Sequence, residues 1–129
     1  MVEPTDPAME AAKAKGRATL PEFFQHLASP AVDESDFSVK FNLTPDHDAE
    51  FIWANGLRVG SDGELTGALA NEPLDERFQM GQRVPIARQR IIDWAYFKAG
   101  VAKGHHTTRV MLEQATPEQA AEIREALGW

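Results

Sequence analysis

The sequence predicts an α+β domain in which helices flank an antiparallel sheet. Apolar residues recur at helical spacing in both terminal parts of the chain and alternate with polar residues through its middle. The alternating runs are short, and turn residues separate them at intervals of about 8–12 residues, which is typical of an antiparallel meander. We therefore expect N-terminal helices, about six short strands curling into a small roll or partial barrel, and a C-terminal helix.

Length and composition limit the class of protein. The chain has 129 residues, of which 43% are hydrophobic, so we expect a single domain over residues 1–129 with one core. It contains no cysteine, which excludes disulfides, thiolate metal ligands and cysteine nucleophiles. The first residues lack a basic segment followed by an apolar one, and no stretch is apolar for long enough to span a bilayer. These features predict a cytoplasmic protein that does not enter a membrane.

Start signals for helices occur at both ends of the chain. Asp6 precedes Pro7, an arrangement that suits the N-cap and first turn of a helix. Thr19–Glu22 has the pattern of a capping box, and an apolar stripe at helical spacing follows. A further capping box opens the final helix, which we expect over residues 116–128 with Gly128 ending it.

Alternation of apolar and polar side chains predicts the strands. Asn55–Gly56 is expected to be a turn, because both residues tolerate positive φ. Pro85 cannot donate a hydrogen bond to a neighbouring strand, so its strand is expected at a sheet edge or at a bulge. Residues 29–36 lack periodicity and are expected to link the helices to the sheet. The strands are expected over residues 37–43, 50–54, 65–69, 81–87, 91–97 and 107–112.

The net charge of −7 is unevenly distributed. The window from Arg77 to Arg109 holds seven basic residues and one acid, a sum of +6, whereas the remainder holds six basic and nineteen acidic residues, a sum of −13. In one interpretation acidic segments of the same domain neutralise the window. In the other, the window forms a basic face that meets an anionic partner.

Two segments hold histidines beside other side chains that could take part in catalysis or bind a metal ion. His105 and His106 are adjacent, and on a strand adjacent side chains point to opposite faces, so they cannot bind one ion together. The loop Asp46–Asp48 has neither HExxH nor EF-hand spacing. We predict no metal, no cofactor, no catalytic residue and no enzymatic activity. The alternative is a small hydrolase or metal-assisted enzyme that uses His105 or His106 with Asp46, His47 or Asp93.

Asp93 and the tryptophans are the other candidates. Asp93 stands between Ile92 and Trp94 in an apolar run, and a buried carboxylate needs either an arginine or hydrogen-bond donors as its partner. Trp53 and Trp94 suit a core at this strand spacing. If exposed beside the arginines, they would instead form a stacking platform for single-stranded nucleic acid.

A set of short motifs resembles a known family. The motifs are Phe37-x-Val39-Lys40, Glu50-x-x-Trp53, Gly67-x-Leu69-x-Asn71-x-Pro73, Gly81-x-x-Val84, Ile92-Asp93-Trp94 and Gly104-x-x-Thr107-x-Arg109. In this order they resemble the bacterial domain of unknown function 2314 (YegJ-like) family over about residues 8–112. The family is uncharacterised, so the resemblance implies no activity, cofactor or catalytic residue.

Two features lie outside that resemblance. His105–His106 stands where the family usually has a glycine and an aromatic residue, which argues against a functional role of these histidines throughout the family. The C-terminal helix is expected to be an addition to the core that caps a sheet edge or meets a partner.

Together these patterns favour a non-enzymatic binding or protein-interaction module. Its partner is expected to be an unknown protein or an anionic ligand, with single-stranded nucleic acid as the alternative. We expect the site in a cleft where a polar turn, a buried acid, an aromatic ring and an arginine meet. The predicted binding residues are Asn71, Arg88, Asp93, Trp94 and Arg109.

Overall fold

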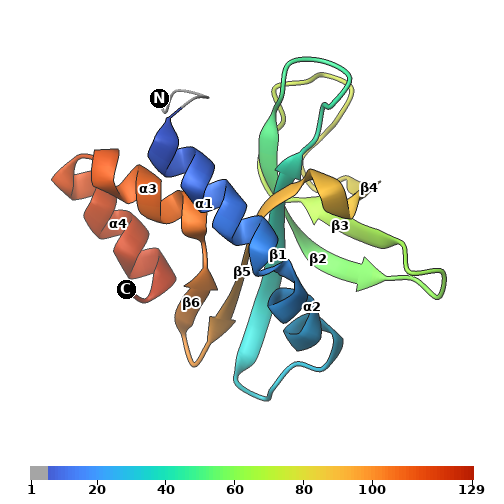
Figure 1. The fold of residues 1–129 in the computed structure, drawn as a ribbon, viewed down its shortest axis with the longest axis horizontal. Helices are drawn as coiled ribbons and strands as arrows, with labels where there is room; N and C mark the ends of the chain where they lie inside the picture. The colour runs from blue at the N-terminus through green and yellow to red at the C-terminus, as the bar shows by residue number, and fades with distance from the viewer. Residues whose placement is uncertain (1–5) are drawn as a thin grey trace.

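The computed structural model describes residues 6–129 and has four α-helices and one open six-stranded sheet (Figure 1). This arrangement confirms the predicted α+β class, with helices at both ends of the chain. No helix within residues 6–129 is long and apolar enough to cross a membrane. The elements are α1 (Pro7–Ala18), α2 (Leu20–Ala28), β1 (Glu34–Asn42), β2 (Phe51–Val59), β3 (Leu65–Leu69), β4 (Arg83–Pro85), the 3-10 turn η1 (Arg88–Arg90), β5 (Ile91–Lys98), β6 (Val101–Gly104), α3 (His106–Gln114) and α4 (Pro117–Leu127).

The strands lie in the order β4-β3-β2-β1-β5-β6, and all neighbouring pairs are antiparallel. The first four strands form a meander. The chain then returns across the sheet, so that β5 pairs with the free side of β1 and β6 pairs with β5. Both edges are short: β4 contains Pro85, as predicted for an edge, and Trp129 covers β6 by donating its indole N–H to the Ala102 carbonyl at 3.0 Å.

Helix α1 is fixed at both ends by local chemistry and tertiary contact. The Asp6 carboxylate accepts hydrogen bonds from the backbone N–H groups of Ala8 and Met9, at 2.8 and 3.3 Å, which confirms the predicted cap. Gly16 lies directly on β5, where a Cβ atom would be 2.2 Å from the Ile92 carbonyl oxygen. Helix α1 therefore packs across β5, with α3 beside it (Figure 1).

The two other predicted capping boxes have opposite outcomes. Thr116 caps α4, since its side chain accepts from the Gln119 N–H while the Gln119 side chain accepts from the Thr116 N–H. The capping box at Thr19 is wrong. Its hydroxyl donates to the Lys15 carbonyl at 2.7 Å and accepts from the Trp94 indole at 2.8 Å. Because α2 follows α1 almost directly, this hydroxyl bonds to the preceding helix.

The largest part of the core lies between α2 and the sheet. Phe23 of α2 is fully buried, and its ring centroid lies 5.6 Å from that of Trp94 and 6.5 Å from that of Tyr96. Val39 and Leu69 are also buried here. Trp94 is 7% exposed, so its ring is part of the core.

Three expectations about element boundaries are wrong. The chain does not turn at Asn55–Gly56: β2 continues to Val59, with Gly56 at φ 56° in a bulge opposite β3. Strand β1 begins inside the expected linker, at Glu34, whose buried carboxylate accepts from the Ala31 N–H at 2.9 Å. The segment Thr107–Leu112 is helical, not a strand.

The helical state of residues 107–112 has a physical cause. Gly104 and His105 have φ values of 79° and 54°, which turn the chain sharply after β6. A carboxylate from β5 then accepts hydrogen bonds from the first turn of α3, as described below. The sheet still has six strands because Val101–Gly104 forms the last one.

Candidate functional site

A buried carboxylate joins the sheet to α3. Asp93 is fully buried, and its Oδ1 atom accepts from the backbone N–H groups of Trp94 at 2.9 Å and His106 at 3.0 Å. Its Oδ2 atom accepts from the backbone N–H and the hydroxyl of Thr107, at 2.8 and 2.7 Å. Unpaired N–H groups and the helix dipole both favour an anion at a helix N-terminus. The partners of Asp93 are thus backbone donors and a hydroxyl, not an arginine.

Lys40 lies beside this carboxylate. It is the cross-strand neighbour of Asp93 in the β1–β5 pair, and its Nζ atom is 3.5 Å from the Thr107 hydroxyl oxygen. Within residues 6–129 its ammonium forms no ion pair with a carboxylate. Burial lowers the pKa of Lys40, Asp93 opposes this change, and Lys13 lowers the pKa further. The structure thus holds a half-buried cation with one distant acceptor.

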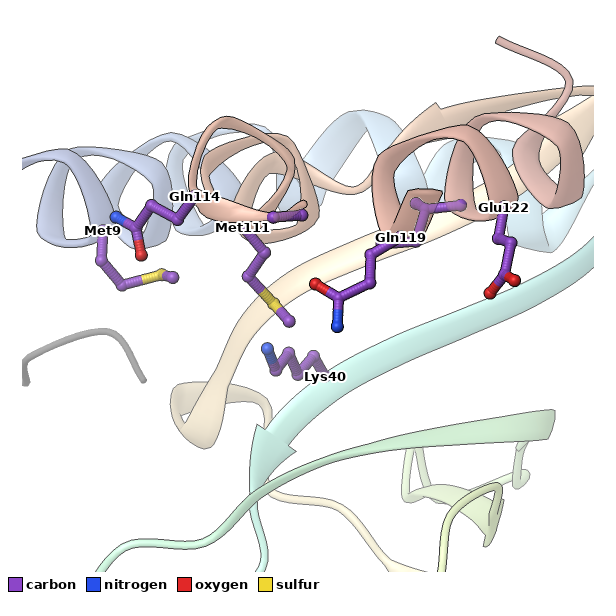
Figure 2. A pocket seen from close by; sticks show the side chains of 8 residues that line it. Met9, Lys40, Met111, Gln114, Gln119 and Glu122 are labelled. Atoms are coloured by element: carbon purple, nitrogen blue, oxygen red, sulfur yellow. The ribbon is translucent and has the colours of Figure 1, made fainter. Parts of the chain in front are cut away.

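A groove opens above Lys40, between β1 and the helices α1, α3 and α4. Its volume is about 640 Å³, in the range of sites that hold small molecules. Figure 2 shows Lys40 rising from β1, with Met111 and Gln119 pointing toward it from α3 and α4. We call this site the Lys40 groove. Its lining residues are Met9, Lys40, Met111, Gln114, Ala115, Gln119, Glu122 and Ile123.

A second cavity, of about 530 Å³, opens where β1 and β2 separate, and Trp53 and His105 lie in its wall. The His105 ring is 4.7 Å from the Trp53 ring and 6.2 Å from the Trp129 ring, and its Nδ1 atom is 2.9 Å from the Thr108 hydroxyl. Burial lowers the pKa of His105 to about 4. This histidine is therefore neutral at pH 7 and packs as an aromatic ring.

The structure brings some of the predicted binding residues near His105. The Asn71 side-chain oxygen accepts from the Trp53 N–H at 3.3 Å, and the Arg109 guanidinium lies 4.0 Å from the Trp129 ring. Both Trp53 and Trp129 neighbour His105. Asn71 and Arg109 thus lie on either side of one aromatic cluster.

The remaining predicted residues lie apart from that cluster. Arg88 stacks on Phe24 of α2, with its guanidinium 4.2 Å from the ring. Trp94 is a core residue, and Asp93 is enclosed by its four donors. The expected cleft of Asn71, Asp93, Trp94 and Arg109 is therefore divided between a surface cluster and the interior.

Lys40 is not among the site residues that the sequence predicts. The alternation of β1 placed it on the polar side of the strand together with Ser38 and Asn42. Two signals were present: Lys40 is a basic residue inside a strand, and it belongs to the first family motif. Neither signal shows that three helices cover this part of β1.

The histidines and the Asp46 loop do not form a joint site. Asp46 pairs with Arg77 at 2.9 Å in the loop between β1 and β2, and Arg77 also pairs with Asp75 at 2.8 Å. The hydrogen bonds that Arg77 donates to Asp75 lower the pKa of Asp75 to about 2. Along the described part of the chain, no three His, Asp or Glu side chains lie close enough together to hold a metal ion.

The basic window is divided over several surfaces. Arg77 pairs with acids of two loops, and Lys98 pairs with Asp33 at 3.2 Å. Arg83 donates to the Thr66 hydroxyl and to the Gly56 carbonyl, while Arg88 and Arg109 stack on aromatic rings. This distribution favours neutralisation within the domain over one continuous basic face.

The geometry defines an α+β domain with an open antiparallel sheet and a lysine-based groove under its helices. By comparison with known families, the chain belongs to the family described as "Uncharacterized protein conserved in bacteria (DUF2314)", which matches residues 6–129. This confirms the resemblance, and the match runs past residue 112 to include α4. No curated protein and no solved structure matches the chain.

Proposed function

We propose that the domain is a non-enzymatic binding module that takes an anionic group into the Lys40 groove. The observation that carries the proposal is the half-buried ammonium of Lys40, which has no carboxylate partner among residues 6–129 and faces a groove lined by both apolar and polar side chains. A desolvated cation attracts an anion more strongly than an exposed lysine does, because water screens the attraction less.

The roles of the polar residues near the groove support binding over catalysis. Asp93 uses both carboxylate oxygens to cap α3, and the Thr107 hydroxyl donates to Asp93. His105 is packed between Trp53 and Trp129. A general base needs a free lone pair within reach of its substrate. In this arrangement Asp93 and His105 serve the fold instead.

The single-stranded nucleic-acid alternative depends on exposed tryptophans beside arginines. Trp94 is 7% exposed and donates its indole N–H to Thr19, so it does not offer a stacking face. Trp53 is half-buried and packs on His105. No observation favours this alternative over the groove.

Binding of the anionic fluorophore 1-anilinonaphthalene-8-sulfonate tests the proposal. We expect saturable fluorescence enhancement with the wild-type protein and a roughly tenfold weaker affinity for Lys40→Met, since a hydrogen bond to a charged group contributes about 1.5–3 kcal/mol. Lys103→Met, at an exposed position of β6, is the matched control and should bind as the wild type does. Equal affinities for Lys40→Met and the wild type would contradict the proposal.

The proposal includes the cytoplasmic location expected from the sequence. Fractionation of bacteria that express the full chain tests this part. Recovery with the cytoplasmic fraction is the expected result, and recovery with the periplasmic fraction would contradict it.

A further inference from the structure

The ammonium of Lys40 lies at the base of the Lys40 groove, and apolar side chains from three helices line part of its walls. Met9 of α1, Met111 of α3 and Ile123 of α4 contribute the apolar surface, and Met111 is 44% exposed. Methionine side chains are unbranched and adapt to the shape of an apolar ligand. These walls suit an aliphatic group that extends from a polar head at Lys40.

The donor capacity of Lys40 defines the head group. An ammonium group has three N–H donors. The Thr107 oxygen, at 3.5 Å, is at the outer limit of a hydrogen bond and is the sole acceptor for Lys40 Nζ within residues 6–129. A half-buried cation is costly without acceptors, and a carboxylate or similar anion would supply them. The nearby Asp93 carboxylate uses its oxygens to accept from its own four donors and forms no ion pair with Lys40 within residues 6–129.

The surroundings favour a single negative charge. Glu122 of α4 also lines the groove, so a second anionic group on the ligand would approach a like charge. The neutral amides of Gln114 and Gln119 line the groove as well. A ligand with one carboxylate at one end avoids this repulsion.

The walls also distinguish a hydrocarbon chain from a peptide. Away from their ends the helices bond their own backbone groups internally, so there the walls offer hydrogen-bond partners through the side chains of Gln114, Gln119 and Glu122. A peptide in the groove would bring N–H and C=O groups that each need a partner. A hydrocarbon chain needs none.

We propose that the Lys40 groove binds a single-chain aliphatic carboxylate, with the carboxylate at Lys40 Nζ and the chain along Met9, Met111 and Ile123. This inference rests on the proposed function and specifies its ligand class. It requires that charge and chain length both contribute to the affinity.

Competition against 1-anilinonaphthalene-8-sulfonate tests the ligand class. The probes are decanoate, methyl decanoate and decylamine, each below the concentration at which it forms micelles or separates from solution. Decanoate is expected to displace the fluorophore, while the neutral ester and the cationic amine should compete at least about tenfold less well. Butyrate, with the same head and a shorter chain, should also compete less well, because it buries less apolar surface.

Binding measurements on variants test whether decanoate binds in the Lys40 groove. Lys40→Met should weaken direct decanoate binding, measured by calorimetry, by at least about tenfold, and Lys103→Met should leave it unchanged. Ile123→Ser shortens the apolar wall at a half-buried position and should weaken decanoate more than butyrate. If Lys40→Met does not fold, Lys40→Arg takes its place; it keeps the charge and should retain binding. The comparison of Ile123→Ser with the wild type then still shows whether decanoate binds in the Lys40 groove.

The two proposals fail in different ways. If the fluorophore binds through Lys40 but decanoate competes no better than its ester, the carboxylate inference is wrong and the binding module stands. If an acidic helical peptide competes and decanoate does not, the carboxylate inference is likewise wrong. The binding module again stands, and its partner is then a protein. If Lys40→Met binds both probes as the wild type does, both proposals are overturned.

Discussion

Asp93 and Thr107 are joined by two hydrogen bonds, in which the backbone N–H and the hydroxyl of Thr107 both donate to one carboxylate oxygen of Asp93, at 2.8 and 2.7 Å. The bonds connect the centre of β5 to the first turn of α3. Both residues are completely buried. Because Lys40 is the cross-strand neighbour of Asp93, this buried pair lies beside the lysine that lines the Lys40 groove.

Removal of the Asp93 carboxylate should destabilise the domain strongly. Asp93→Ala leaves the N–H groups of His106 and Thr107 buried without acceptors, so we expect a loss of about 3 kcal/mol or more in the free energy of unfolding, measured with urea. Asp48→Ala is the control, because Asp48 is exposed. Comparable losses in the two variants would show that the cap contributes little.

Gly16→Ala should destabilise the protein although alanine favours helices. At an exposed helical site this change stabilises a helix by about 1 kcal/mol. Here the new Cβ atom would lie 2.2 Å from the Ile92 carbonyl oxygen and 3.1 Å from the Asp93 Cα atom, so α1 must move away from β5. We expect a net loss of about 1–3 kcal/mol in thermal or urea unfolding.

The reverse change at an exposed position of α1 serves as the control for Gly16. Ala11→Gly should cost about 1 kcal/mol, the ordinary difference in helix propensity. An increase in stability for Gly16→Ala would mean that α1 and β5 are not in close contact.

The free energy of unfolding should fall at acidic pH because His105 is buried as a neutral imidazole. Burial lowers the pKa of this imidazole from 6.5 to about 4, Asp93 opposes the change, and Arg109 adds to it. The unfolded state therefore binds a proton at a higher pH than the folded state. The stability due to neutral His105 is complete above pH 6.5 and is lost as the pH falls toward 4, by up to about 3 kcal/mol.

His105→Asn tests this dependence. Asparagine accepts the left-handed backbone conformation at φ 54° and does not titrate, so the variant should lose less stability than the wild type between pH 7 and 4.5 in urea unfolding. Some dependence should remain, since burial also lowers the pKa of His106. His47→Asn, in an exposed loop, should follow the wild type. A wild-type pH dependence in His105→Asn would refute the assignment.

Trp129 should protect the β6 edge. Trp129→Phe keeps an aromatic ring for Arg109 but removes the indole N–H that donates to the Ala102 carbonyl. We expect a loss of about 1 kcal/mol and faster hydrogen–deuterium exchange of the β6 amides. Trp53→Phe makes the same change within the aromatic cluster around His105 but keeps the bond from Trp129 to Ala102, and it should leave β6 exchange unaltered. If the β6 amides of Trp129→Phe exchange at the wild-type rate, the indole N–H of Trp129 does not protect this edge.

Local signals in the sequence determined much of the fold. The caps at Asp6 and Thr116 act within one helical turn, so α1 and α4 were predictable from neighbouring residues. Alternation placed most strands correctly, because one buried face requires it. Thr107–Leu112 was misassigned because its helical start depends on Asp93, a residue distant in the chain. The bulge at Gly56 depends likewise on pairing with β3.

The sequence by itself determined that a carboxylate inside an apolar run needs a partner, because desolvation of Asp93 would otherwise be too costly. Only the tertiary structure decided that the partner is the N-terminus of α3. The same holds for the Lys40 groove, whose walls come from α1, β1, α3 and α4. The sequence predicts an exposed side chain for a lysine on the polar side of β1. Lys40 is instead a half-buried cation, because helices from both ends of the chain pack over it.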